Sequence, residues 1–238
     1  MKKAAILTLL SISMLALTAC DKKLSKAKYD EKLNEAISYV ETTDEIKDVH
    51  VQTRLSIEVW DYKENEYFKY RYFVLALIIP IEYGHATWKG DDGKYYHSEM
   101  KVDLKNEGWK TVEIDETQFN TYMTAHKAEI KAELLKPLNL AKNLSDEKVE
   151  EYSSIKSSYK QTMEGNYVIN SKCQQTIADE SSSKTYDITY AINFKNKLPV
   201  SYQKKTKDNS ENKTSTDKTS YTYGKSSFTA PGSNNNNN

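Results

Sequence analysis

Four histidines are the residues of this 238-residue chain best suited to metal binding or proton transfer near neutral pH. His85 and His97 flank the turn GDDG at residues 90–93, so they belong to the two strands of one predicted hairpin. A loop with an even number of residues pairs Ala86 with His97 and turns His85 to the opposite face. A loop with an odd number brings both histidines together, with Glu99 as the nearest carboxylate. Because no third ligand stands at a recognised spacing, the sequence predicts no metal site.

Known catalytic motifs are absent from the sequence. It contains no G-x-S-x-G, P-loop, H-E-x-x-H or G-x-G-x-x-G pattern. His126 lies on the apolar stripe of a predicted helix, which indicates a core or lid histidine and not a general base. We therefore expect a protein that is not an enzyme and needs no cofactor.

The N-terminus has the parts of a secretory signal. Lys2 and Lys3 form a short basic region, and the apolar residues 4–17 fall short of the ~20 that span a bilayer. This stretch ends in LTAC, residues 17–20, which closely resembles the lipobox of bacterial lipoproteins. The resemblance implies that the Cys20 sulfur carries diacylglycerol and that cleavage removes residues 1–19. The alternative is an ordinary secretory signal with a chance cysteine.

Acyl chains on Cys20 would hold the protein at a membrane, because each buried methylene contributes ~0.8 kcal/mol. We expect a lipid-anchored chain on the extracytoplasmic face of the cell membrane, which is the periplasmic side if the organism has an outer membrane. Residues 20–28 would form a short polar tether. Cys173 is the second of two cysteines, so no intrachain disulfide is expected. Its phase with Ile169 predicts a buried core residue, with a reactive thiol or an intermolecular disulfide bridge as the alternatives.

The first half of the chain predicts one helix and an antiparallel sheet. Apolar residues at steps of three and four indicate a helix over residues 25–42. A two-residue alternation indicates a strand over residues 49–59. Short links then join further strands, which makes the sheet antiparallel. These strands are predicted at residues 66–79, 83–89, 94–104 and 109–114.

The second half predicts two helices within residues 116–163 and four more strands. Pro137 breaks or kinks the first helix, and Ser145 with Asp146 caps the second. The apolar face of the second helix would contain Ile155 and Tyr159. The strands lie near residues 166–178, 185–194, 198–207 and 214–228. We expect a single α+β domain over residues 29–231, followed by a disordered low-complexity tail at residues 232–238.

The segment FVLALIIPI, residues 73–81, is strongly apolar in a chain whose mean hydropathy is −0.77. Nine residues are too few to span a bilayer as a helix. Both alternating sets of side chains are apolar, so the strand should be covered on both faces. The cover is either protein or a ligand in a cavity. The candidate lining of such a cavity is Phe73, Leu75, Leu77, Ile79, Phe119, Met123 and Ile130.

The charge of the chain gives no sign of a nucleic-acid partner. The 34 basic residues balance 34 acidic residues, and no block of basic residues forms a phosphate-binding stretch. The membrane, through Cys20, is the partner that the sequence predicts, with a lipid or amphiphile as a further ligand. The sequence identifies no protein partner.

The order of helix, five strands, two helices and four strands behind a lipobox resembles the LolA/LppX-type lipoprotein-carrier superfamily. The residues that carry the resemblance are ITYAINFKNKLPVSYQKK, residues 188–205, and YTYGKSSFTAP, residues 221–231. It implies a strongly curved, unclosed antiparallel barrel whose concave face is covered by helices. It also implies that a lipid or acyl chain is held in the gap between them. The alternative is a non-enzymatic surface interaction or signalling module of the cell envelope without a small-molecule ligand.

Overall fold

The computed structural model describes residues 21–44, 49–53, 56–63, 66–73, 81–101, 108–178 and 183–224. Cys20, the signal peptide and the tail at residues 232–238 lie outside the described residues. So do Leu75, Leu77 and Ile79 of the predicted cavity lining, and only the backbone of Phe73 is described. Within the described part, no helix is both long and apolar enough to cross a membrane.

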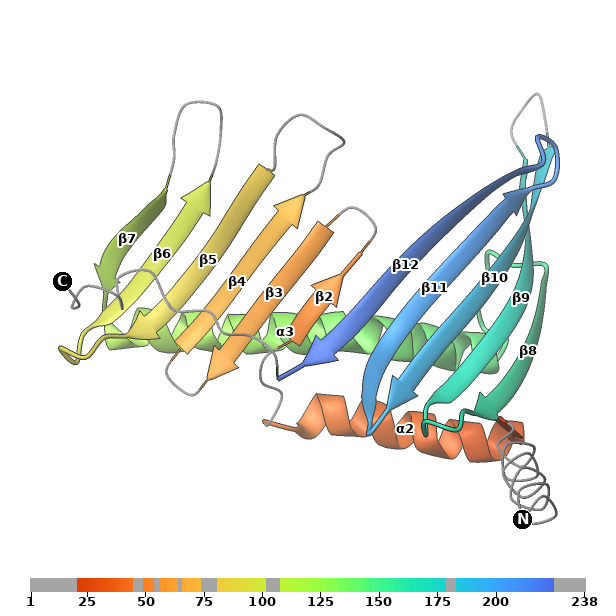
Figure 1. The fold of residues 1–238 in the computed structure, drawn as a ribbon, viewed down its shortest axis with the longest axis horizontal. Coiled ribbons are helices and arrows are strands. Elements are labelled where there is room, and N and C mark those ends of the chain that lie inside the picture. The colour runs from red at the N-terminus through yellow and green to blue at the C-terminus, as the bar shows by residue number, and fades with distance from the viewer. Residues whose placement is uncertain are drawn as a thin grey trace, which may run out of the picture.

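The described residues form an α+β structure with two helices, α2 (Lys26–Thr42) and α3 (Glu116–Ser145), and one open antiparallel sheet of twelve strands. The strands are β1 (Lys22–Lys23), β2 (Val49–Gln52), β3 (Ser56–Lys63), β4 (Glu66–Phe73), β5 (Ile81–Lys89), β6 (Tyr95–Lys101), β7 (Trp109–Ile114), β8 (Ser154–Gln161), β9 (Tyr167–Ala178), β10 (Ser183–Lys195), β11 (Leu198–Asp208) and β12 (Lys213–Tyr223). Their spatial order is β1-β8-β9-β10-β11-β12-β2-β3-β4-β5-β6-β7 (Figure 1). The pairing of β12 with β2 joins the strands that follow α3 to the strands that precede it.

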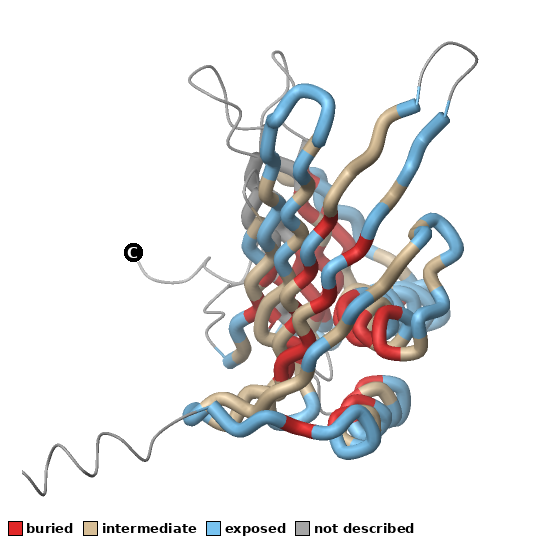
Figure 2. The backbone as a smooth tube through the Cα atoms, turned by 90° about the vertical axis from the view of Figure 1, so that its right-hand side faces the viewer, coloured by how far each residue is buried: buried red, intermediate tan, exposed pale blue. Residues whose placement is uncertain are grey.

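Both helices lie on the same side of the sheet (Figure 1). The long helix α3 runs across the strands and contacts β4, β5 and β6 in one half and β8 to β11 in the other, while α2 packs against α3 and β8. Figure 2 shows buried residues gathered where the helices face the sheet. Fully buried large side chains of this core include Tyr29, Leu33, Trp60, Tyr67, Leu134, Leu138, Ile169, Ile188 and Phe194.

The helix predicted over residues 25–42 is confirmed. Ser25 is its N-cap, and its side chain accepts a hydrogen bond from the Lys28 backbone N–H at 3.3 Å. The buried stripe recurs at steps of four, three and four residues, which keeps one face of α2 on the core. Its members are Tyr29, Leu33, Ala36 and Val40.

The single strand predicted over residues 49–59 is wrong, because the structure has two paired strands, β2 and β3, over this range. β2 pairs with β3 so that Val49 lies opposite Trp60, and both side chains are 1% exposed. Gln52 pairs with Ile57, which leaves an even number of residues between them. An even number of intervening residues reverses the phase of the alternation, so Trp60, at an even number, shares the core face with Val49, at an odd number.

The second predicted helix is also wrong. The helix α3 passes through Pro137 without a break and ends at Ser145, and residues 154–161 form the strand β8 between β1 and β9. Ile155 and Tyr159 are four residues apart, a spacing that puts two side chains on one face of a helix or of a strand. The pattern is therefore compatible with both, and pairing with β9 decides for the strand. Asp146, predicted to start a helix, is the C-cap of α3.

The predicted tether is folded onto the domain from Asp21 onward. Lys22 and Lys23 pair with β8 as β1, and Leu24 is 6% exposed. The carboxylate of Asp21 lies 2.5 Å from the ammonium of Lys160 on β8. Asp21, which directly follows the residue predicted to carry the lipid, is therefore held at this edge of the sheet.

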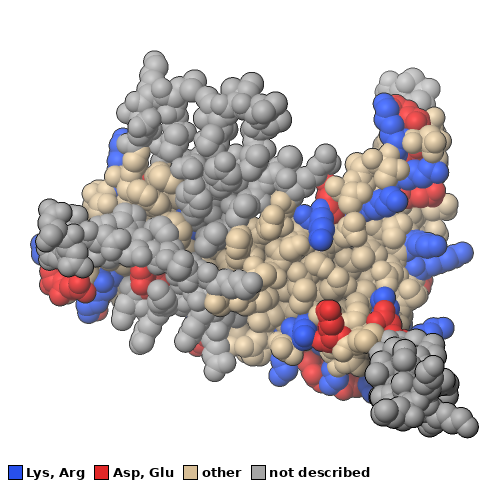
Figure 3. Space-filling model, in the orientation of Figure 1, with Lys and Arg blue, Asp and Glu red and all other residues tan. Residues whose placement is uncertain are grey.

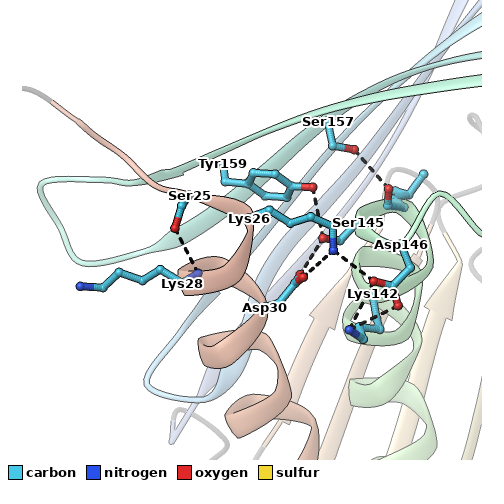
Figure 4. A network of polar contacts seen from close by, with 10 residues as sticks. Ser25, Lys26, Lys28, Asp30, Lys142, Ser145, Asp146, Ser157 and Tyr159 are labelled. Carbon is cyan, nitrogen blue, oxygen red and sulfur yellow. Dashed lines mark hydrogen bonds and ion pairs between the residues drawn. The ribbon is translucent and has the colours of Figure 1, made fainter.

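A polar network ties α2, the end of α3 and β8 together (Figure 4). The Ser145 hydroxyl donates a hydrogen bond to Asp30 Oδ1 at 2.6 Å and lies 3.1 Å from the hydroxyl of Tyr159. Lys26 Nζ bridges Asp30 Oδ2 at 2.5 Å and Asp146 Oδ1 at 3.2 Å. Segments that are more than a hundred residues apart in the sequence are thus fixed at one corner of the fold.

Candidate functional site

The hairpin of β5 and β6 has the register that brings its two histidines together. Thr87 pairs with His97, and His85 pairs with Glu99, across a five-residue loop at residues 90–94. The even-loop register that pairs Ala86 with His97 is therefore wrong. In the loop, Gly93 has a φ of 78°, a conformation in which a residue without a Cβ is not strained.

His85, His97 and Glu99 line a cavity of about 400 Å³ between α3 and the strands β4, β5 and β6. The helix contributes Tyr122, His126 and Glu129, which are spaced by four and three residues and therefore share one face of α3. Three of the chain's four histidines meet here. The lining residues are Lys69, His85, His97, Glu99, Tyr122, His126 and Glu129.

Stacked rings connect the sheet wall of the cavity with the helix wall. The rings of His97 and Tyr122 are parallel within 2°, with centroids 4.2 Å apart. Tyr67 on β4 and His126 on α3 stack in the same way, with centroids 3.6 Å apart. Each contact joins a strand residue to a helix residue, which fixes the distance between α3 and this half of the sheet.

Two histidines of the cavity, His126 and His97, are held in the neutral form by their surroundings. Burial lowers the pKa of His126 to about 3, helped by the nearby His97 and His85. Burial likewise lowers the pKa of His97, against the opposing effect of Glu99. Neutral imidazoles can accept a hydrogen bond or bind a metal ion. The Nε2 atom of His126 is buried and has no hydrogen-bond partner among the described residues.

One group of three side chains could hold a metal ion. The Nε2 atom of His97 lies 3.7 Å from Glu99 Oε1, and the Nδ1 atom of His85 lies 3.8 Å from the same oxygen. The other ring nitrogen of His97, Nδ1, is hydrogen-bonded to the hydroxyl of Thr87 at 2.9 Å. The buried cation of the cavity, Lys69, forms an ion pair with Glu129.

The cavity lining proposed from sequence differs from the lining of this cavity. Phe119, Met123 and Ile130 are 4%, 5% and 2% exposed and belong to the main hydrophobic core. Phe119 packs on Tyr95 at a centroid distance of 4.6 Å. None of the three lines this cavity or the pocket beside Pro137 and Tyr202. Sequence reasoning missed Lys69, Tyr122 and Glu129, although the four-and-three spacing from Tyr122 through His126 to Glu129 could have indicated a shared helix face.

The strand β4 is covered on both faces at the cavity. Tyr67, Phe68 and Lys69 are consecutive residues that point to alternate faces, and all three are buried. Phe68 joins a second apolar cluster with Ala86 and Trp88 on the face away from α3. Lys69, the last of these three residues, is four residues before Phe73, where the apolar segment FVLALIIPI begins.

Cys173 lies in the main core, as its phase predicts. It is 3% exposed, and burial raises the pKa of its thiol to about 11. A thiol in this setting is a small apolar core residue and not a nucleophile.

The chain matches none of the protein-family models, curated proteins or solved structures with which it was compared.

Proposed function

We propose that this chain is a membrane-anchored extracytoplasmic lipoprotein that binds or carries an amphiphilic ligand on the helix-covered side of a curved, unclosed sheet. The lipobox ending at Cys20 supports the anchor. The open antiparallel sheet, with both described helices on one side, supports a sheet whose helix-covered side is available to a ligand.

The observation that carries the proposal is the cavity of about 400 Å³ between α3 and the strands β4 to β6. Its volume falls within the roughly 300–1,000 Å³ typical of small-molecule sites. Aromatic rings form much of its wall, and imidazole, ammonium and carboxylate groups supply polar contacts at defined positions. Such a wall suits the polar end of an amphiphile better than an acyl chain.

We assign the other end of such a ligand to the apolar segment FVLALIIPI, which begins at Phe73, the last residue of β4. Phe73 is four residues beyond Lys69, or about 13 Å along the strand. An acyl chain whose head group occupies the cavity would extend along β4 toward this segment.

The distribution of charge is compatible with a neutral or zwitterionic partner surface. Figure 3 shows basic and acidic side chains mixed around the edges of the described face, with uncharged residues across the middle of β10 to β12. Lys69, within the cavity, is compensated by Glu129. Steering by a large field of one sign is not needed for a ligand that arrives from the membrane.

Ligand binding is tested by lipid analysis and by uptake of a fluorescent fatty acid. The Cys20→Ser chain, purified without its own lipid anchor, should release copurified lipid on organic extraction, measured by mass spectrometry. Leu77→Asp should weaken fatty-acid uptake, whereas Ser153→Asp, in the exposed loop before β8, should leave it unchanged. Lipid-free protein with equal uptake by both variants would refute ligand binding.

Anchoring is tested separately in bacterial membranes. The wild-type chain should incorporate labelled palmitate and sediment with the membrane fraction, and Cys20→Ser should do neither. A Cys20→Ser chain that still carries label would contradict the assignment of the acylated residue.

A second candidate function is a surface interaction or signalling module that binds no small molecule. The packing of Phe119, Met123 and Ile130 into the core favours it, because these side chains face protein and not a void. If this function is correct, the purified protein should contain no lipid. It should also crosslink specifically to another envelope protein through residues of the exposed sheet face.

A further inference from the structure

We propose that His85, His97 and Glu99 form a binding site for a divalent transition-metal ion, with Zn²⁺ as the ion that their donor atoms suit best. The site goes beyond the proposed function, because it is defined by three side chains of the β5–β6 hairpin and needs no amphiphile in the cavity.

The donor atoms lie close to the arrangement that a metal ion requires. One atom from each residue can be chosen so that all three lie within 4.8 Å of one another. Zn²⁺ binds nitrogen and oxygen ligands at about 2.0–2.2 Å, so two ligands in a tetrahedral site are about 3.3 Å apart. The present separations from Glu99 Oε1, 3.7 Å and 3.8 Å, can close by small side-chain rotations.

The most buried ligand is held in place by its neighbours. The hydroxyl of Thr87, which is fully buried, is hydrogen-bonded to Nδ1 of His97 at 2.9 Å. With the proton on Nδ1, the lone pair of Nε2 points toward Glu99 and is available to a metal. Tyr122 stacks on the same ring at 4.2 Å and fixes its plane. Such outer contacts set the orientation of histidine ligands in known metal sites.

The other two ligands can move and leave the site accessible. The side chains of His85 and Glu99 are 35% and 50% exposed, compared with 8% for His97. An ion can therefore enter from solvent, and its coordination can be completed when the side chains of His85 and Glu99 rotate toward it. The fourth coordination position would open toward the cavity, where the buried Nε2 of His126 lies on the opposite wall.

The donor set discriminates between classes of metal ion. Two imidazoles and one carboxylate suit Zn²⁺ and neighbouring first-row ions, whereas Mg²⁺ and Ca²⁺ prefer sites made of oxygen ligands. The positive charge of Lys69, which also lines the cavity, is compensated by its ion pair with Glu129. The carboxylate of Glu99 supplies the negative charge that favours a cation at this point.

The test is equilibrium dialysis of the detergent-solubilised full-length chain, stripped with a chelator, against Zn²⁺ at pH 7.5, with metal measured by mass spectrometry. We expect one Zn²⁺ per chain and no competition from an excess of Mg²⁺. Glu99→Gln and His85→Asn, both at partly exposed positions, should each weaken Zn²⁺ binding at least about tenfold. Glu113→Gln, on the neighbouring strand β7 with a side chain 56% exposed, is the matched control and should bind as the wild type does.

Urea denaturation of each metal-free variant checks that it is folded. Absence of Zn²⁺ binding by the wild-type chain would overturn the proposal. Wild-type affinity in both Glu99→Gln and His85→Asn would also overturn it, because the ion would then be held elsewhere.

Discussion

Tyr67 on β4 and His126 on α3 stack face to face, with ring centroids 3.6 Å apart and 7° between the ring planes. The contact places an imidazole between the long helix and the sheet, where burial holds its pKa at about 3. Protonation of His126 in the folded protein is therefore opposed by its whole environment, including the positive charge of Lys69.

Lowering the pH should destabilise the metal-free protein through this histidine. The pKa of His126 is about 3 in the folded chain and about 6.5 when unfolded, so between these values the unfolded state binds a proton that the folded state does not. Above pH 6.5 neither state binds this proton, so His126 does not lower the free energy of unfolding. Below pH 6.5 the free energy of unfolding falls by up to about 1.4 kcal/mol for each unit by which the pH is lowered. Urea denaturation in a chelator between pH 7 and pH 5 measures this slope.

His126→Phe is the control for the pH effect, because it keeps an aromatic ring against Tyr67 and cannot titrate. Its slope should be smaller than that of the wild type. Some slope should remain, since burial also lowers the pKa of His97. An unchanged slope in His126→Phe would show that His126 is not the group responsible.

The hydrogen bond from Ser145 to Asp30 should contribute measurably to stability. Ser145 is 1% exposed and the side chain of Asp30 is 16% exposed, so Ser145→Ala removes the donor from a largely buried carboxylate. We expect a loss of about 1–3 kcal/mol in the free energy of unfolding. Lys26→Ala removes the ion pairs with Asp30 and Asp146 at a side chain 48% exposed, and should cost less than about 1 kcal/mol. Equal losses in urea denaturation would contradict this ranking.

Cys173 should resist thiol reagents until the protein unfolds. A pKa of about 11 instead of 9.0 reduces the thiolate at neutral pH about 100-fold, and burial further blocks the reagent. In a Cys20→Ser background, iodoacetamide labelling followed by mass spectrometry should be slow. Lys172→Cys places a thiol on the exposed face of β9 at the adjacent position and should react rapidly. Fast labelling of Cys173 in the folded chain would refute its assignment to the core.

Gly84 should not tolerate a larger side chain while Trp109 is present. A Cβ at this position would lie 2.7 Å from Cη2 of Trp109 and 3.0 Å from the carbonyl oxygen of Lys69. Gly84→Ala should therefore destabilise the protein by about 1–3 kcal/mol through overpacking. Adding Trp109→Leu removes the closer contact and should recover part of the loss, measured as a shift in Tm. A double variant no better than the sum of the two single variants would exclude this clash as the cause.

The features predicted correctly depend on neighbouring residues in the sequence. The helix over residues 25–42 follows from its apolar stripe and from Ser25, and the strands after Gly165 follow from two-residue alternation. The α+β class and the antiparallel sheet follow from these elements and their short links. Each of these patterns lies within one short segment of the sequence, so contacts with distant residues are not needed to interpret it.

The errors fall where a local pattern has two solutions. Ile155 and Tyr159 suit one face of either a helix or a strand, and only the neighbouring strand β9 selects the strand. The alternation from Val49 to Val59 does not reveal that this range forms two strands paired with each other. In both cases the structure adopted depends on backbone hydrogen bonds to another strand. That strand is β9 for residues 154–161, and for β2 it is β3.

The cavity shows the same division. The sequence by itself determined that His85 and His97 lie in one hairpin and that His126 lies on the apolar stripe of a helix. Only the tertiary structure decided that the two strand histidines share a face, because a five-residue loop sets their register. It also decided that α3 brings His126 across from them, since the position of a helix on a sheet is set by packing between residues far apart in the sequence.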